Sequence, residues 1–367
     1  MSHATTTLHP SIWNPVTVGN MHLPHRLAMA PMTRSRADAD GSPNALMAEY
    51  YAQRASLGLL ITAGTQPSAD GQGYLGTPGI HTAAHVAGWR RVTDAVHARG
   101  GHLFIQLMHV GRTSHPDNTP HHHQPVAPSA IASGGKIFTA SGMQDTPVPR
   151  ALSIDEIQAT TQDFVRAAER AIEAGADGVE IHGANGYLIH QFLGASSNTR
   201  TDAYGGTIDK RARFALEVAA AVAERIGPER TGIRLSPGNG LGGVDEGPEL
   251  PELYRHLVAG LAERDLAYLH VMHVGNEELL RDIRHLWPNA LLVNRAGRTL
   301  DAIGADIEAG LADMAPVARW ALANPDFPER LRLGAPLNDI DPATLYSGGA
   351  DGYTDYPTLT KAQRQTA

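Results

Sequence analysis

The sequence predicts an α/β fold, a single (β/α)8 TIM barrel, and three observations predict it. Apolar runs of strand length alternate with segments of helical periodicity, which is typical of a parallel sheet covered by helices. The alternation occurs eight times, and eight parallel strands close this kind of barrel. The chain has 367 residues, a length that such barrels reach as one unit, and no linker divides it. We therefore expect one domain over residues 1–367.

The eight expected strands are short and rich in apolar side chains. They cover residues 27–32, 58–65, 102–108, 178–182, 231–236, 268–273, 290–294 and 313–318. The clearest helix between them is expected over residues 153–174. Ser153 and Glu156 stand at the spacing of a capping box at its start, and Gly175 is the residue type that ends a helix.

Two segments lie outside the barrel repeat. Residues 16–23 carry Gly19 and Asn20 between two short runs, which predicts a β-hairpin that forms an N-terminal lid over the bottom of the barrel. Residues 109–152 follow the third strand and are rich in Pro, Gly, Ser and Thr. We expect them to form one long irregular loop, because such insertions in compact domains are usually lids or binding loops.

The composition excludes several classes of function. The formal net charge is −8 and no run of Lys and Arg is present, so no nucleic-acid partner is expected. No apolar stretch is long enough for a membrane helix and no leader pattern is visible, so we expect a cytoplasmic protein without a membrane partner. The sequence has no cysteine, which removes thiolate and iron–sulfur chemistry. Redox chemistry would therefore depend on an organic cofactor.

Three consecutive histidines, His121, His122 and His123, stand between Pro120 and Pro125. This context predicts an exposed loop. Neighbours in sequence rarely converge on one ion, so we expect no metal site here.

The chain resembles a known family over essentially its whole length. The run HGANGYLIHQFLGASSNTRTDAYGG, from His182 to Gly206, closely resembles the signature of the old yellow enzyme family. NPVTVGNMHLPHRLAMAPMTR, QLMHVGRTSHP, RARFALEV and GYTDYPTL match too, in the family's order. The resemblance implies one FMN-binding barrel that passes hydride from NADPH or NADH through FMN to activated alkenes: enals, enones, maleimides or nitroalkenes. It leaves the choice between monomer and homodimer open.

The resemblance also implies roles for residues near the ends of the predicted strands, where barrel active sites lie. His182 and Asn185 match the pair that hydrogen-bonds the carbonyl or nitro oxygen of the substrate, and Tyr187 matches the proton donor. Taken alone, His182 could be a core histidine and Tyr187 could pack on Leu188. Tyr346 and Met108, which replaces the tryptophan of many relatives, are expected to line the substrate pocket.

The implied flavin contacts lie around the same strand ends. Gln106 would bind the pyrimidine edge, Arg234 the N1 and O2 side, and Thr33 the O4 oxygen. From sequence alone, Thr33 could equally be a helix cap, and an arginine such as Arg234 could form a surface ion pair. Backbone contacts beneath the ring are expected from Pro31, Met32 and Gly64.

The expected phosphate site departs from the family pattern. Gly297 and Arg319 match phosphate-binding positions. Arg295 stands in the usual glycine region, where it either adds a phosphate contact or points away. Ala318 replaces a glycine and is expected to be tolerated only if its φ is negative.

Two alternatives remain at this stage. One is a TIM-barrel aldolase or isomerase that acts on a phosphorylated substrate. It would need a lysine or paired carboxylates at strand ends, whereas Lys136 and Lys210 lie outside the predicted strands. The other is a non-catalytic flavin-binding protein, which would not need His182, Asn185 and Tyr187 together.

Overall fold

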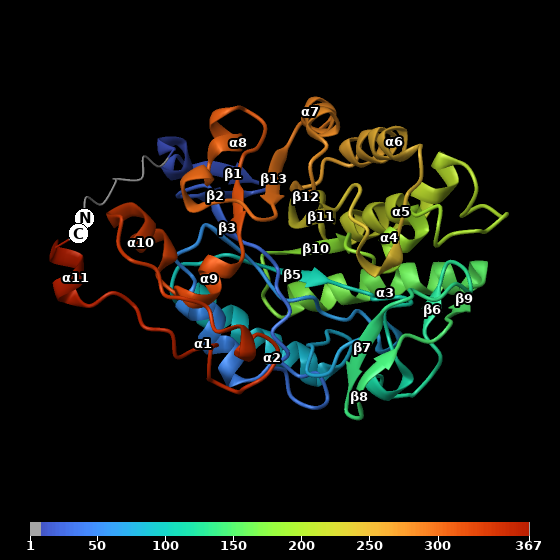
Figure 1. Cartoon of the computed structure of the whole chain (residues 1–367), viewed down its shortest axis with the longest axis horizontal. Helices are drawn as coiled ribbons and strands as arrows, with labels where there is room; N and C mark the ends of the chain where they lie inside the picture. The colour runs from blue at the N-terminus through green and yellow to red at the C-terminus, as the bar shows by residue number, and fades with distance from the viewer. Residues whose placement is uncertain (1–8, 367) are drawn as a thin grey trace.

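Eight parallel strands form a barrel in the computed structural model, which describes residues 9–366 (Figure 1). The strands are β3 (Leu27–Met29), β4 (Leu59–Ile61), β5 (Leu103–Leu107), β10 (Gly178–Gly183), β11 (Thr231–Leu235), β12 (Tyr268–His273), β13 (Ala290–Arg295) and β14 (Ala315–Val317). Their order in the sheet is β13-β12-β11-β10-β5-β4-β3-β14. A parallel bridge between Leu292 and Met314 joins the two outer strands and closes the barrel. The predicted fold class is confirmed.

All eight predicted strands overlap an observed strand, but several predictions run too far. The strand predicted over residues 58–65 is observed only over Leu59–Ile61, and the one predicted over residues 27–32 ends at Met29. Beyond Ile61 the chain leaves the sheet, and Thr65 keeps only an isolated bridge to Leu107. The residues that follow these two strands are also buried and largely apolar. The sequence pattern therefore does not mark where each strand ends.

Helices surround the barrel. They are α1 (Ala45–Gln53), α2 (Ala83–His97), α3 (Ile154–Glu173), α4 (Leu188–Leu193), α5 (Ile208–Ile226), α6 (Leu250–Ala262), α7 (Glu277–Leu286), α8 (Ala305–Glu308), α9 (Arg319–Ala323), α10 (Phe327–Leu333) and α11 (Lys361–Thr366). Short 3-10 helices cover Pro10–Trp13, Ala69–Gly71, Pro116–Asn118, Pro228–Arg230, Leu241–Gly243, Leu300–Ala302 and Pro342–Thr344. No helix within residues 9–366 combines the length and the hydropathy that a membrane span needs.

The predicted helix over residues 153–174 is confirmed together with its caps. The backbone N–H of Glu156 donates to the Ser153 hydroxyl at 3.2 Å, and the backbone N–H of Ser153 donates to the Glu156 carboxylate at 2.8 Å. Gly175 has a φ of 88°, the left-handed conformation that terminates a helix.

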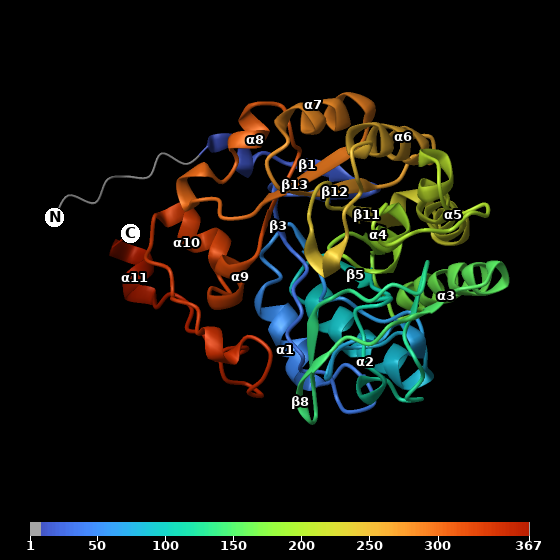
Figure 2. The same cartoon turned by 45° about the vertical axis from the view of Figure 1, so that its right-hand side comes forward.

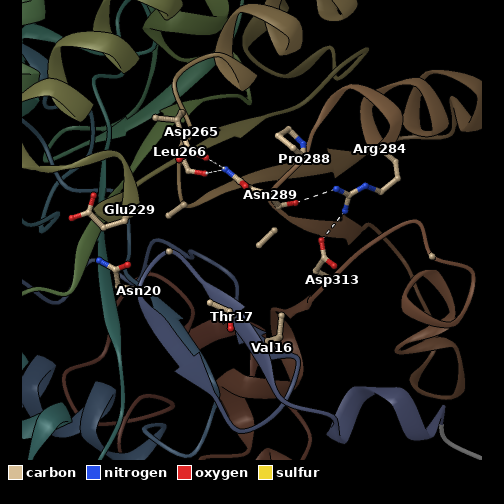
Figure 3. Close-up of a pocket in the computed structure, with 14 residues that line it drawn as sticks. Val16, Thr17, Asn20, Glu229, Asp265, Leu266, Arg284, Pro288, Asn289 and Asp313 are labelled. Carbon is tan, nitrogen blue, oxygen red and sulfur yellow. Dashed lines mark hydrogen bonds and ion pairs between the residues drawn. The ribbon is translucent and has the colours of Figure 1, made fainter.

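The predicted hairpin closes the bottom of the barrel. β1 (Val16–Val18) and β2 (Met21–Leu23) pair antiparallel around a turn in which Gly19 has a φ of 54°. Val18 and Leu23 are fully buried against Phe104, Tyr268 and other residues of the barrel interior. Beside the hairpin lies a cavity of about 700 Å³ whose wall includes the ion pair between Arg284 and Asp313 (Figure 3). This cavity is at the end opposite the predicted site.

The long insertion is more ordered than the irregular loop that we expected. Within residues 109–152, β6 (Val126–Ala127) pairs with β9 (Arg150–Ala151), and β7 (Lys136–Thr139) forms a hairpin with β8 (Gly142–Asp145). Ile137 and Thr139 are buried while their neighbours are exposed, so β7 alternates like a half-buried strand. The expectation of an irregular loop was wrong because these strands have only two to four residues each, too few to give a clear pattern.

The C-terminal segment runs from α10 past α1 to α11 (Figure 2). Two buried arginines that follow β3 hold it in place. Arg34 donates to the carbonyl oxygens of Leu345 and Gly352 at 2.9 and 2.7 Å. Arg36 donates to that of Thr344 at 2.6 Å.

Candidate active site

The C-terminal ends of neighbouring strands bring most of the predicted site residues together. β10 lies between β5 and β11, and its residues Glu180 and His182 are in register with Gln106 of β5 and Arg234 of β11, respectively. All four side chains are buried. Gln106, His182 and Arg234, which the sequence placed at strand ends, therefore lie side by side on adjacent strands.

A buried carboxylate, which the sequence analysis missed, orients Gln106. The Gln106 Nε2 donates to Oε1 of Glu180 at 2.7 Å, and His270 Nδ1 lies 2.8 Å from Oε2 of the same carboxylate. Burial opposes the charge on Glu180, but His270, Arg234 and Gln106 together hold its pKa below the usual value. Burial lowers the pKa of His270 and the adjacent Glu180 opposes that effect, while the Nδ1–H of the ring donates to the carboxylate. Glu180 stands two residues before His182 on one strand, a spacing that puts both on the same face and could have revealed it.

Arg234 is a buried cation that forms no ion pair with a carboxylate of residues 9–366. It is 6% exposed, and its Nη2 lies 3.8 Å from the sulfur of Met272. Its Nε has no hydrogen-bond partner among the described residues. Burial lowers its pKa, and Glu180 offsets part of that effect. A surface ion pair is therefore the wrong interpretation of Arg234, because its side chain is buried and forms no ion pair with the described residues.

His182 is a neutral hydrogen-bond donor. Burial, followed by the charges of Arg234 and His270, holds its pKa well below the usual value. Its Nδ1 accepts a hydrogen bond from the backbone N–H of Ala184 at 3.2 Å, so the ring proton resides on Nε2. The tautomer follows from this contact.

Asn185 is held in a strained backbone conformation. It has a φ of 57°, and its backbone N–H donates to the hydroxyl of Ser236 at 2.8 Å. Its Oδ1 accepts a hydrogen bond from Asn239 Nδ2 at 3.2 Å, which leaves the Nδ2 of Asn185 as the free donor. Ser236 and Asn239 follow β11, and no sequence signal pointed to either.

Tyr187 shares a hydrogen bond with a second tyrosine. The hydroxyl oxygens of Tyr187 and Tyr74 are 3.1 Å apart. The ring of Tyr187 is perpendicular to that of His182, with 4.9 Å between centroids. Burial, and then Tyr74, raises the pKa of Tyr187 well above its usual value. Tyr74 lies in the loop after β4, where the sequence analysis assigned no site residue.

A buried network supports the turn that carries these groups. The backbone N–H of Gly186 donates to His190 Nδ1 at 2.9 Å, and His190 Nε2 lies 2.9 Å from the Glu246 carboxylate. The hydroxyl of Tyr254 donates to the same carboxylate at 3.0 Å. Gly186 has a φ of 81°, and a Cβ there would overlap the carbonyl oxygen of Leu241. The turn is therefore both buttressed and dependent on glycine.

The predicted phosphate end forms a separate cavity of about 240 Å³ at the ends of β12, β13 and β14. Gly297, Ala318 and Arg319 line it. Ala318 has a φ of −106°, so it meets the condition under which the glycine could be replaced. Arg319 is exposed and lies over the Trp320 ring at 5.4 Å. No carboxylate of the described residues forms an ion pair with Arg319, which leaves its charge available.

Arg295 is committed to carboxylates. Its Nε and Nη2 donate to Asp306 at 2.9 and 2.8 Å, and its Nη1 donates to Glu277. Arg298 also donates to Asp306. Arg295 lines the same cavity, but because Asp306 and Glu277 take up its donors, the structure favours the possibility that it adds no phosphate contact.

The remaining predicted residues differ in how they join the site. Pro31, Met32 and Thr33 follow β3, and Asn44, not Thr33, caps the next helix. The helix-cap interpretation of Thr33 is therefore wrong. Met108 is buried and packs directly on Gly64. The contact is so close that a Cβ added to Gly64 would overlap the Met108 sulfur. Tyr346 is 66% exposed, although it is near enough to influence the pKa of Tyr187.

Comparison with known proteins gives consistent matches over nearly the whole chain. A family model described as the NADH:flavin oxidoreductase / NADH oxidase family matches residues 11–338. A probable flavin mononucleotide-dependent alkene reductase of Leishmania infantum is 43% identical over 355 residues, 94% of this chain and 96% of that protein. The 12-oxophytodienoate reductase 2 of Arabidopsis thaliana is 41% identical over 364 residues, 94% of this chain and 95% of that protein.

Solved structures are equally similar. Morphinone reductase in complex with tetrahydroNAD superposes with a TM-score of 0.92 at 44% identity, covering 96% of this chain and 99% of that chain. The old yellow enzyme homologue from Zymomonas mobilis gives a TM-score of 0.91 at 39% identity, covering 95% and 100%.

Proposed function

The chain belongs to the NADH:flavin oxidoreductase / NADH oxidase family, the old yellow enzymes, and from this premise we propose that it is an FMN-dependent ene-reductase. Its electron donor is NADPH or NADH, and its substrates are small activated alkenes. The observation that carries the proposal is the convergence of Gln106, His182 and Arg234 on neighbouring strand ends, with Asn185 and Tyr187 on the turn that follows β10.

The residues present fit FMN. The unpaired Nε of Arg234 can donate to a pyrimidine oxygen, and the Gln106 amide is fixed through Glu180 so that its Oε1 stays available as an acceptor. The cavity at Gly297 and Arg319 supplies a free cation and open space for the phosphate. The other residues that would hold the cofactor are Pro31, Met32, Thr33, Gly64 and Ala318. Bound FMN supplies hydride transfer between the nicotinamide and the alkene.

His182 and Asn185 bind the oxygen of the substrate's activating group. Both present neutral donors, Nε2–H and Nδ2–H, whose orientation is fixed by contacts on the opposite side of each group. Preorganised donors of this kind stabilise negative charge that develops on a carbonyl or nitro oxygen. Because the neutral His182 carries no charge of its own, it stabilises the developing anion without attracting anions in the ground state.

Tyr187 donates the proton that completes the reduction. Its raised pKa keeps the phenol protonated, and the hydroxyl of Tyr74 holds it in position. Met108 and Tyr346 form the outer wall of the substrate pocket. The enzyme acts as a monomer or as a homodimer.

The rival functions fit the site less well. Lys136 lies in β7 of the insertion and Lys210 lies on α5, so neither is at a strand end where an aldolase would need it. The fixed donors of His182 and Asn185 would have no role in a protein that only stores flavin.

The test is spectroscopic. Purified protein reconstituted with FMN should be yellow, should bleach when mixed anaerobically with NADPH or NADH, and should regain its colour on addition of cyclohexenone. Protein that bleaches but does not reoxidise with cyclohexenone, maleimide or a nitroalkene would contradict the ene-reductase assignment.

A further inference from the structure

The histidine run that the sequence analysis set aside lies next to an aspartate from another loop. Asp70 belongs to the 3-10 helix Ala69–Gly71 after β4, and His121 and His123 belong to the insertion after β5. One ligand atom of each of these three side chains lies within 4.8 Å of the other two. The rings of His121 and His123 stack with centroids 4.1 Å apart. We expected that consecutive histidines would not approach one ion. That expectation did not consider residues two positions apart, such as His121 and His123, which can lie on the same side of an extended loop.

His122, between them, points elsewhere. It has a φ of 55°, and its Nδ1 lies 2.9 Å from the carbonyl oxygen of Pro116. This left-handed residue turns its own ring away and lets the rings on either side face Asp70. The three histidines are therefore not equivalent.

The contact between His121 and Asp70 does not have the geometry of a hydrogen bond. His121 Nε2 is 2.7 Å from Oδ1 of Asp70, yet this buried nitrogen has no hydrogen-bond partner among the described residues. A ring N–H at this distance from a carboxylate normally points at one of its oxygens and forms a hydrogen bond. The two atoms are therefore close together without being joined by a hydrogen bond, so both could bind a third group.

The arginines around Asp70 are paired with other carboxylates. Arg150 is close enough to Asp70 to sense its charge, but its guanidinium already donates to Glu156 at 2.8 Å. Asp163 is near enough to sense the charge of Asp70, but its own carboxylate is paired with Arg166 at 2.5 Å. In residues 9–366, the ion pair that Asp70 itself makes is the one to His121.

We propose that Asp70, His121 and His123 form a binding site for a divalent transition-metal ion, with Zn²⁺ as the best-suited ion. Two imidazoles and one carboxylate are ligands that Zn²⁺ prefers, and water fills the fourth position. Zinc bonds of about 2.0–2.2 Å need ligand atoms closer together than 4.8 Å, so the exposed side chains of Asp70 and His123 close in on binding. At His121 the ring proton moves to Nδ1, and the 3.0 Å contact from the His123 backbone N–H is given up.

The site would act as a structural clamp close to the substrate pocket. The same two segments are already joined by Asn118 Nδ2, which donates to the carbonyl oxygen of Gly73 at 3.0 Å. Gly73 is followed in the chain by Tyr74, whose hydroxyl contacts that of Tyr187. A metal at Asp70 would therefore fasten the insertion to the loop that positions Tyr74. Its effect should be on stability, since within residues 9–366 the contacts of Asp70, His121 and His123 include none to His182, Asn185 or Tyr187.

The test uses untagged, FMN-loaded protein freed of metal by a chelator and titrated with ZnCl₂ in a calorimeter. We expect one Zn²⁺ per chain and a rise in the melting temperature, with no response to MgCl₂. Outer partners of metal ligands alone contribute about 10–100-fold to affinity, so Asp70→Asn, His121→Ala and His123→Ala should each weaken binding by about tenfold or more. His122→Ala is the matched control and should leave binding unchanged.

Two results would overturn the proposal. One is a chain that takes up no Zn²⁺, or that binds it equally well after Asp70→Asn. The other is equal weakening by His122→Ala and His123→Ala, which would mean that the run binds metal only as an unstructured histidine tract. The visible spectrum of bound FMN checks that each variant is folded.

Discussion

Gln106 donates a hydrogen bond to Glu180, and both side chains are buried at the ends of adjacent strands, with 2.7 Å between Nε2 and Oε1. The contact fixes which end of the Gln106 amide faces the cofactor. It also places an anion beside Arg234, whose charge would otherwise be buried without compensation. Glu180 is therefore a positioning residue that acts through its two neighbours.

Replacement of Glu180 should weaken FMN binding. Hydrogen bonds to charged groups contribute about 1.5–3 kcal/mol, so Glu180→Gln should raise the FMN dissociation constant by about tenfold or more. Quenching of free-flavin fluorescence measures this constant. Because Glu180 acts partly through Gln106, the double variant Glu180→Gln/Gln106→Ala should lose less affinity than the sum of the two single losses. Additive losses would show that the carboxylate acts independently of Gln106.

Removal of the Tyr187 hydroxyl should slow only the reaction with the alkene. A general acid contributes about 10²–10⁴-fold, so Tyr187→Phe should lower that rate at least a hundredfold. Stopped-flow bleaching by NADPH, which needs no phenol, should be unchanged. Equal loss in both half-reactions would point to a collapsed site instead.

The raised pKa of Tyr187 predicts an unusual pH profile. A phenol donates a proton only below its pKa, and burial together with Tyr74 moves that limit well above the usual value. The rate of alkene reduction should therefore stay flat up to about pH 10, the ordinary value for tyrosine. Tyr74→Phe removes the hydrogen bond that helps to raise the pKa, so its alkaline limb should move to lower pH. An unchanged pH profile in Tyr74→Phe would show that the Tyr74 hydroxyl does not control the pKa of Tyr187.

The phosphate end predicts opposite results for two arginines. Arg319 has no carboxylate partner among the described residues, so Arg319→Ala should weaken FMN binding by about tenfold, in line with the loss of a charged hydrogen bond. Riboflavin, which lacks the phosphate, is the control ligand and should bind both proteins equally. Arg295 is paired with Glu277 and Asp306, so Arg295→Ala should lower the melting temperature and leave the ratio of FMN to riboflavin affinity unchanged.

Gly186 should tolerate no side chain. Its positive φ alone costs an L-residue about 1–2 kcal/mol, and a Cβ would also overlap the carbonyl oxygen of Leu241. Gly206 has a similar φ of 94°, but a methyl group added there would meet no described atom within 4 Å, so Gly206→Ala isolates the cost of backbone strain. Gly186→Ala should lower the melting temperature clearly more than Gly206→Ala. Equal shifts would mean that the loop of Leu241 can move aside.

The sequence alone was enough to predict the barrel and most of the candidate site. The eight strands and the α3 caps follow from local periodicity and from residue types at fixed spacing, which are written along the chain. His182, Asn185 and Tyr187 were found by a different route, because the run that holds them resembles the signature of a known family.

Other features required the tertiary structure. The pairing of Arg295 with Asp306, the contact between Tyr74 and Tyr187, and the convergence of Asp70 on His121 all join side chains from different loops or elements. Local patterns say which residues a loop contains but not where its backbone turns, because loop paths depend on packing against the finished barrel. The sequence therefore determined which groups could take part in chemistry, and only the folded chain decided which of them meet.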